Sequence, residues 1–353
     1  MRLFLIKKEE TMEKKNIERL SQLSSAMGVS SNERPVADLL KPYYTDLADE
    51  LLKDRLGSIF AVKKSKNPNA KTVMIASSLD EVGLMISEVH KDATLSFIPL
   101  EGLSAASLLH QRVYVYTRDN EPILGVISAN VHAMASADSV KMDQLYIDLG
   151  SQEMADKILP GDLVALDGAF EVTGNHIAVG KALNHRLLVE AGLEILEELK
   201  DDELDYNLVV GGVAASVVGN RGTMTSTYVV KPDCALVLCG FDVKNSKSKL
   251  EKGKGTVVAY QDAGMIPSKR LLYDVTQSIQ NFQTSVGTIA NDGSFIHKTL
   301  KGCPSVSLGV SLSHCGTPNV MADLNDVDGL VSQVATYLRS LNSEKISYFG
   351  FGE

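Results

Sequence analysis

Hydrophobic and polar residues alternate with different periods along the chain, which divides it into three stretches. Near the N-terminus, "NIERLSQLSSAM" and "VADLLKPYYTDLADELL" predict two helices, the second kinked or divided at Pro42. "SIFAVKK" and "KTVMIASSL" then predict two strands. From about Val82 to Phe170 the runs are short and separated by Gly, Asp and Asn turns, with no long helical pattern. Such a stretch is typical of a small β-barrel or sandwich.

After this stretch, strand and helix patterns alternate. "IAVGKAL" precedes the helical "RLLVEAGLEILEEL", and "CPSVSLGV" precedes "DLNDVDGLVSQVATYL". Alternation of this kind indicates a sheet covered by helices. We therefore predict a helix/sheet/helix sandwich domain of the α/β class, formed by residues 1–81 and 171–353 and interrupted by a β-rich insert of residues 82–170. The length of 353 residues agrees, because it exceeds what one core usually supports.

Composition excludes some classes of binding partner and indicates the cellular compartment. A formal net charge of -9 and the lack of a basic cluster argue against nucleic acid or an anionic membrane as partner. The apolar runs are far below the roughly 20 residues that span a bilayer, and Leu3 to Ile6 is too short for a signal-peptide core. Four cysteines in a chain this long do not indicate a disulfide framework. We predict a cytoplasmic protein, with Met12 as a second candidate start.

Polar residues gather where the predicted strands end, which is where α/β proteins place ligands. The strand-to-helix corner "GKALNHR" carries Asn184 beside His185. The other strand-end corners carry further groups with possible chemistry: Ser78, Asp80, Glu81, Ser216, Val217, Cys239, Asp242, His314, Cys315 and Gly316.

The order and spacing of these corners resemble a known enzyme family. The matching segments include "SLDEVGLMI", "PGDLVALD", "GKALNHR", "VVGNRGT", "NDGS" and "TPNVMADLNDV". Together they resemble the tetrahedral-type metalloaminopeptidases of peptidase family 42, the glutamyl, lysyl and deblocking aminopeptidases also called cellulase-M-like. The resemblance covers nearly the whole chain. It implies a zinc-peptidase-like α/β domain, an insert that acts as lid and dimerisation domain, and assemblies up to dodecameric tetrahedra. It also places His132 in a loop that reaches towards a neighbouring subunit, although we interpret that histidine as a solvated loop residue.

The resemblance further implies two divalent metal ions, held by two histidines, two aspartates and a glutamate. Carried over position by position, these five ligands fall on Ser78, Asn184, Val217, Cys239 and Gly316. The glutamate that serves the family as general base falls on Ser216.

The replacements lack the chemistry of the residues they replace. Valine and glycine carry no ligand atom, a serine hydroxyl is a poor ligand for zinc or cobalt, and one thiolate is not a site. A neutral amide cannot bridge two dications as a carboxylate does, and an unassisted serine hydroxyl is no general base near pH 7. We therefore predict a catalytically inactive homologue without a cofactor, a pseudoenzyme that serves as a structural or regulatory subunit or binds peptides. Its expected partners are copies of itself, from dimer to dodecamer, or active paralogues.

Two alternatives remain. The first is an active aminopeptidase that releases N-terminal residues with a rebuilt site for one zinc or cobalt ion, drawn from Asp80, His185, Asp242 and His314. If its segment is extended, His314 points to the same side as Gly316 but lies about 6.6 Å from it along the chain. The second alternative is a scaffold whose insert binds another protein.

Three other catalytic readings are weaker. A pair of carboxylates at Asp80 and Glu81 could suggest a hydrolase, but we interpret Asp80 as a turn cap or a partner of His185 or Arg186. Cys239 or Cys315 would need a base within reach to act as a nucleophile, which sequence adjacency to His314 does not supply. The surroundings of Ser216 do not match the G-x-S-x-G nucleophile elbow.

Overall fold

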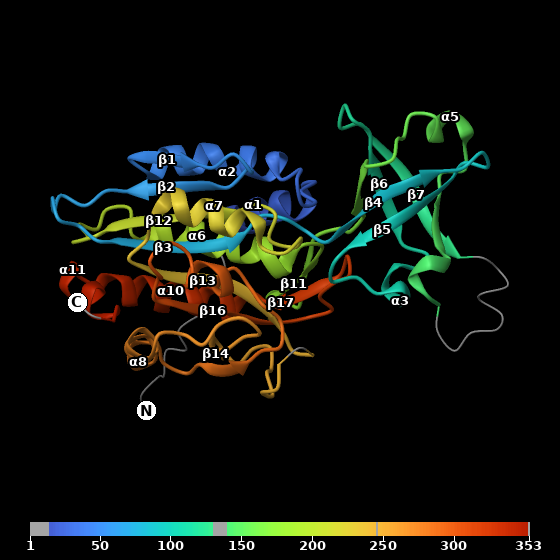
Figure 1. Ribbon diagram of the computed structural model, residues 1–353. Helices are drawn as coiled ribbons and strands as arrows, with labels where there is room; N and C mark the ends of the chain where they lie inside the picture. Colours follow the sequence, from blue (N-terminus) through green and yellow to red (C-terminus); the bar gives the residue numbers. More distant parts are fainter. Residues whose placement is uncertain (1–13, 130–139, 245, 352–353) are drawn as a thin grey trace.

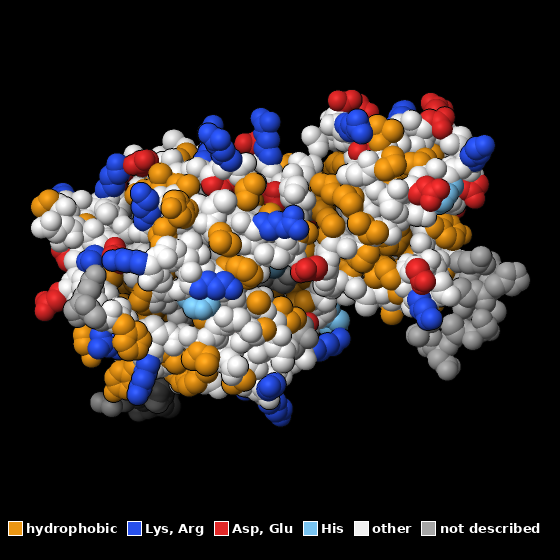
Figure 2. Space-filling model, viewed as in Figure 1, with side chains coloured by type: hydrophobic (Ala, Val, Ile, Leu, Met, Phe, Trp, Pro, Cys, Tyr) orange, Lys and Arg blue, Asp and Glu red, His pale blue; other side chains and the backbone are white. Residues whose placement is uncertain are grey.

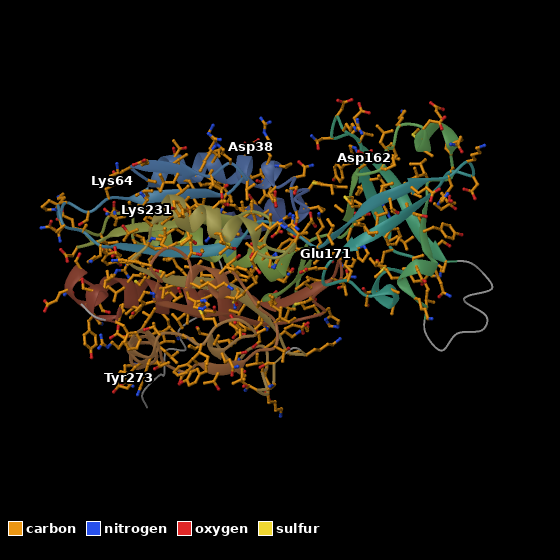
Figure 3. The ribbon with its side chains drawn as sticks, viewed as in Figure 1. Asp38, Lys64, Asp162, Glu171, Lys231 and Tyr273 are labelled. Atoms are coloured by element: carbon orange, nitrogen blue, oxygen red, sulfur yellow. The ribbon has the colours of Figure 1, made fainter. Side chains whose placement is uncertain are left out.

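The computed structural model describes residues 14–129, 140–244 and 246–351. The predictions for Met12 and His132 lie outside these residues. The described chain forms two parts, a layered α/β domain and a β-barrel that projects from one end of it (Figure 1). Figure 3 labels Asp162 on the barrel and Glu171 at the junction, where the chain returns to the α/β domain.

A mixed sheet forms the centre of the α/β domain. Its main path is β1 (Glu50–Lys53), β2 (Ile59–Lys63), β12 (Asn207–Val213), β3 (Thr72–Ser78), β13 (Cys234–Asp242), β16 (Ser305–Ser313), β17 (Val320–Asp323), β11 (Ile177–Gly180) and β10 (Glu171–Thr173). Strand β14 (Val257–Gln261) pairs with β16 and with β15 (Gln283–Val286). The four central strands β12, β3, β13 and β16 are parallel. Their carboxyl ends therefore meet at one edge of the sheet.

Helices cover both faces of this sheet. The larger core lies under α1 (Lys14–Ser25), α2 (Arg34–Leu47), α6 (Leu183–Glu198), α8 (Lys269–Ser278), α10 (Leu324–Arg339) and α11 (Ser343–Tyr348). A smaller core lies under α7 (Arg221–Val230) and α9 (Gly293–Ile296) on the other side. The sandwich predicted from alternating strand and helix patterns is confirmed.

The stretch predicted to be β-rich forms a closed barrel. Its strands follow the order β4 (Gly83–Val89), β5 (Thr94–Leu100), β8 (Leu145–Asp148), β7 (Pro122–Ala129), β6 (Arg112–Tyr116) and β9 (Leu163–Leu166). Its helices α3 (Ala105–Leu108) and α5 (Gln152–Ala155) are one turn long. Residues such as Val113, Val115 and Ile127 fill the interior. The predicted limits of the insert fall between β3 and β4 and between β9 and β10.

Local predictions were wrong at two places. Helix α2 ends at Leu47, and residues 50–52, predicted as its continuation, belong to β1 and pair with β2 instead. Pro42, predicted to kink or divide the helix, lies inside α2 without dividing it. The segment "RGTMTSTYVV" forms α7, although its β-branched residues are weak helix formers and no helix was expected there. Tertiary packing overrides local propensity at these places. Within the described residues, no helix is long and apolar enough to cross a membrane.

Candidate functional site

A cavity of about 360 Å³ opens at the carboxyl ends of the parallel strands. All six positions that the resemblance assigns to metal ligands and general base line it: Ser78, Asn184, Ser216, Val217, Cys239 and Gly316. They come from segments far apart in the sequence, at the ends of β3, β12, β13 and β16 and in the first turn of α6. The fold therefore brings the six positions together, while the side chains at these positions are neutral.

Asp292 organises one wall of this cavity, although Asp292 itself is only 2% exposed. Its Oδ2 accepts a hydrogen bond from Ser78 Oγ at 2.7 Å, and its Oδ1 accepts one from Ser216 Oγ at 2.9 Å. Asn220 Nδ2 and Thr223 Oγ1 also donate to Oδ1. The two serines at the first-ligand and general-base positions thus hold a buried carboxylate, and such charge-assisted bonds are stronger than neutral ones.

Gly316 has a backbone that favours glycine. Its φ is +75°, and a Cβ added there would lie 2.2 Å from the carbonyl oxygen of Gly102, which comes from the barrel side of the cavity. Residues with a side chain rarely adopt this φ, and the contact would be far inside van der Waals distance. A histidine at this position would require the chain around Gly102 or Gly316 to move.

His185 presents a neutral imidazole to the cavity. Its Nδ1 lies 2.7 Å from the backbone oxygen of Asp80. Because a carbonyl oxygen can only accept, Nδ1 carries the proton in this contact. Burial lowers the pKa of His185, which favours the neutral ring and leaves Nε2 as an acceptor.

Asp80 lies beneath the cavity wall and is fully buried. Its Oδ2 accepts from Ser30 Oγ at 2.6 Å and from the amide of Val217 at 2.8 Å. Its Oδ1 has no hydrogen-bond partner within the described chain. Burial raises the pKa of Asp80 to about 7, and burial likewise raises the pKa of the nearby Glu33 to about 7. Asp80 was predicted to cap a turn or to pair with His185 or Arg186. His185 Nδ1 lies 3.7 Å from its Oδ1, whereas Arg186 pairs with Glu81 instead.

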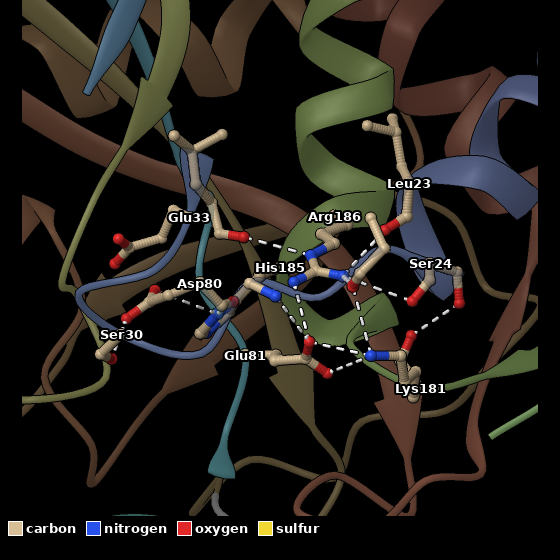
Figure 4. A network of polar contacts seen from close by, with 12 residues as sticks. Leu23, Ser24, Ser30, Glu33, Asp80, Glu81, Lys181, His185 and Arg186 are labelled. Carbon is tan, nitrogen blue, oxygen red and sulfur yellow. Dashed lines mark hydrogen bonds and ion pairs between the residues drawn. The ribbon is translucent and has the colours of Figure 1, made fainter. Parts of the chain in front are cut away.

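Glu81, the next residue, joins a buried ion cluster with Lys181 and Arg186 (Figure 4). Lys181 Nζ lies 2.9 Å from both carboxylate oxygens, and Arg186 Nη2 lies 3.1 Å from Oε1. Arg186 also donates to the backbone oxygens of Leu23, Ser24 and Leu79. All three charged residues are at most 5% exposed. This cluster ties the N-terminal helices to the "GKALNHR" corner.

The four candidate ligands of a rebuilt metal site do not all reach the cavity. His185 and Asp242 line the cavity, whereas Asp80 and His314 are not among its lining residues. His314 is exposed with a φ of 62°, so the segment is not extended as the offset from Gly316 assumed. Within the described residues, no group of three or more His, Cys, Asp or Glu side chains is arranged to hold a metal ion.

The residues at the ligand positions do not fit the two ions that the resemblance implies. The Ser78 hydroxyl already donates a hydrogen bond to Asp292. Cys239 offers a single thiol, and burial raises its pKa well above the usual range, which favours the neutral form over the thiolate. Val217 and Gly316 offer no ligand atom, and Asn184 offers a neutral amide. Cys315 is no better placed as a nucleophile, because burial raises its pKa to about 12.

Two site residues were missed from the sequence. Asp292 lies within "NDGS", a segment that carried the resemblance without an assigned role. Asp262 follows "VVAYQ" and lines the cavity from the end of β14. Asp262 follows a strand and Asp292 precedes a short helix. Acidic residues are common at such positions in surface turns, so the sequence alone does not mark them as site residues.

The comparisons with known proteins agree with this fold. The family model for M42 glutamyl aminopeptidase matches residues 57–332. This chain belongs to the M42 family. The glutamyl aminopeptidase of Lactococcus lactis subsp. cremoris is 28% identical over 355 residues, which covers 94% of this chain and 98% of the relative. The lysyl aminopeptidase of Pyrococcus furiosus is 24% identical, covering 92% of this chain and 97% of the relative.

A solved structure agrees equally well. A TET aminopeptidase from a marine sediment archaeon of the Thaumarchaeota superimposes with a TM-score of 0.90 at 28% identity, covering 95% of this chain and 99% of that one. The M42 fold therefore extends over nearly the whole chain, and the predicted family is confirmed.

Proposed function

We propose that this member of the M42 family is non-catalytic and that its cleft binds peptides without cleaving them. One observation carries the proposal. Ser78 and Ser216, at the first-ligand and general-base positions, both donate their hydroxyl hydrogen bonds to the buried Asp292. The cleft is thereby stabilised by its own hydrogen bonds, and both hydroxyls donate to a carboxylate rather than to an imidazole.

The second candidate is an active aminopeptidase with a rebuilt site for one zinc or cobalt ion. The comparisons favour it, because the relatives in the same family are named as aminopeptidases. The residue in the cavity that supports it is His185, whose Nε2 is available as a ligand or proton acceptor.

Metal content and turnover separate these candidates. The purified protein is incubated with zinc, cobalt or manganese, and bound metal is measured by elemental analysis alongside release of chromophore from aminoacyl substrates. We expect neither stoichiometric metal nor turnover. Stoichiometric metal with turnover that His185→Ala abolishes would establish the active enzyme instead. His90→Ala, on the barrel, is the matched control, because His90 is not among the residues that line the cavity.

We further propose that the chain forms homo-oligomers, between a dimer and a dodecamer, or co-assembles with active paralogues in the cytoplasm. Hydrophobic side chains gather on the barrel surface in Figure 2. Ile98 on β5 and Leu124 and Val126 on β7 are each more than 40% exposed. The TET1 peptidase of Pyrococcus horikoshii, a structure with the same fold, assembles into a tetrahedron or an octahedral shell. Light scattering coupled to size-exclusion chromatography tests this, and a monomer at micromolar concentration would contradict it.

A further inference from the structure

Helix α7 has an outer face whose hydrophobic side chains are exposed. Met224, Tyr228 and Val229 on this face are 54%, 65% and 40% exposed. Met224 and Tyr228 are four residues apart, so they lie on one side of the helix. Hydrophobic side chains that share a face and remain exposed mark a candidate interaction site.

The turn after β1 and the segment after α9 extend this face on either side of the helix, because α7 packs against both β1 and α9. Thr225 Oγ1 donates a hydrogen bond to Asp54 Oδ2 at 2.6 Å, which ties the turn to α7. Leu56 in the turn is 46% exposed, and Leu300 in the segment after α9 is 43% exposed. We call residues 53–57, 221–231 and 295–302 together the α7 surface.

The α7 surface is basic, although the chain as a whole has a net charge of -9. In Figure 2, basic side chains lie beside the hydrophobic ones over α7, and Figure 3 labels Lys231, which follows this helix. Asp54 is the carboxylate within these segments, and it already accepts hydrogen bonds from the amides of Leu56, Gly57 and Ser58. The exposed cations of the surface are Lys53, Arg55, Arg221, Lys231, Lys298 and Lys301.

We propose that the α7 surface is a docking site for an acidic amphipathic segment of another protein. Apolar side chains with cations around them fit a partner whose apolar residues are flanked by carboxylates, because opposite charges select the partner and speed its binding. Methionine adapts its shape to different apolar partners, and tyrosine adds contact area with a polar end. The aliphatic Leu56 and Val229 favour a protein over a nucleic acid, whose bases stack on aromatic rings. Docking at this surface does not depend on whether the cleft is catalytic.

Two labelled peptides test the proposal by fluorescence anisotropy with the full chain. One peptide is an amphipathic helix with leucine on one face and glutamate on the other, and the second has lysine in place of every glutamate. We expect the glutamate peptide to bind at least about tenfold more tightly, and its binding to weaken as salt is raised. The net charge of -9 would by itself favour the lysine peptide, so non-specific attraction predicts the opposite order.

Substitutions show where the peptide binds. Tyr228→Ser should weaken binding of the glutamate peptide at least about fivefold. Tyr273→Ser on α8 is the matched control, because Tyr273 is 66% exposed and lies outside the α7 surface. Arg55→Glu should weaken binding about threefold, whereas Lys200→Glu, at an exposed position after α6, should leave it unchanged. All four side chains are exposed, so we expect each variant to fold, which circular dichroism checks.

Several results would overturn the proposal. Equal affinities for the two peptides, or binding of neither, would remove its basis. Binding that Tyr228→Ser and Arg55→Glu leave unchanged would place the site elsewhere. Loss of an oligomer in Tyr228→Ser, measured by light scattering, would mean that a second copy of this chain covers the surface. A labelled oligothymidine that binds more tightly than the glutamate peptide, and less tightly to Tyr228→Ser, would identify a nucleic acid as the partner.

Discussion

The strand-end corner has a framework side, formed by the ion cluster of Glu81, and a cavity side, and the two differ in what surrounds a buried carboxylate. On the framework side, Glu81 is matched by Lys181 and Arg186, so a buried carboxylate meets two buried cations. On the cavity side, Asp292 is held by hydroxyl and amide groups, and no lysine or arginine is among the described lining residues. Asp80 and Glu81 are neighbours in sequence, yet they belong to opposite sides.

The ion cluster stabilises the fold, whereas the residues that line the cavity occupy the positions assigned to the family's chemistry. The ion cluster joins Lys181 and Arg186 of "GKALNHR" to the N-terminal helices, so it is structural whether or not the cleft is catalytic. The cavity side carries the positions that the resemblance assigns to ligands and base. The side chains there are neutral, and two of them, Ser78 and Ser216, bond to Asp292. The residues that stabilise the fold and the residues at the positions assigned to catalysis are thus adjacent but separate sets.

Disrupting the ion cluster on the framework side should have the largest effect on stability. Glu81→Gln removes the negative charge between two buried cations, and we expect it to lower the free energy of unfolding by roughly 3–5 kcal/mol. Urea denaturation followed by circular dichroism measures this. Glu203→Gln is the control, because the ion pair of Glu203 with Lys66 is exposed to solvent and its loss should leave stability nearly unchanged. Equal effects of the two variants would show that the cluster is not structural.

The cavity side is probed at Gly316. Gly316→Ala combines an unfavourable φ, costing about 1 kcal/mol, with the overlap on Gly102, costing roughly 1–3 kcal/mol more. The control is Gly150→Ala, because Gly150 has a φ of +66° and nothing within 4 Å of an added Cβ. We expect Gly316→Ala to lower the free energy of unfolding more than Gly150→Ala does. Matching losses would show that the loop at Gly102 yields readily and that the position could accept histidine.

The pH dependence of stability sharpens the contrast at Asp80. Burial raises the pKa of Asp80 to about 7, above the value near 3.9 of an unfolded aspartate. The folded protein therefore binds more protons than the unfolded one between these values, and stability falls as the pH rises towards 7. Between pH 5 and pH 8, we expect the free energy of unfolding of the unaltered protein to fall by about 1 kcal/mol or more relative to that of Asp80→Asn.

Urea denaturation at the two pH values measures this difference. Asparagine can still accept from Ser30 and from the amide of Val217, so the variant preserves the contacts while removing the titration. Asp119→Asn, at an exposed position on the barrel, is the control, and its free energy of unfolding should change with pH as that of the unaltered protein does. Parallel pH profiles of the protein and Asp80→Asn would mean that Asp80 does not titrate in this range.

The amino-acid sequence by itself determined the α/β domain, the β-rich insert and the family. Alternating and helical periods are local properties, so they predicted β3, α6, β16 and α10 correctly. The order of the corner motifs located Ser78, Ser216 and Gly316, which line one cavity in the structure. Where packing outweighs propensity, the local pattern missed α7 and predicted a helix in place of β1.

Only the tertiary structure decided what the replaced residues do. Ser78 and Asp292 are 214 positions apart and Ser216 and Asp292 are 76 apart, so no local pattern relates them. The backbone at Gly316, the exposed position of His314 and the buried, unbonded oxygen of Asp262 likewise depend on contacts between distant segments. The physical reason is that a hydrogen bond or an overlap depends on positions in space to within tenths of an ångström. Hydrophobic periodicity specifies only which face of an element is buried.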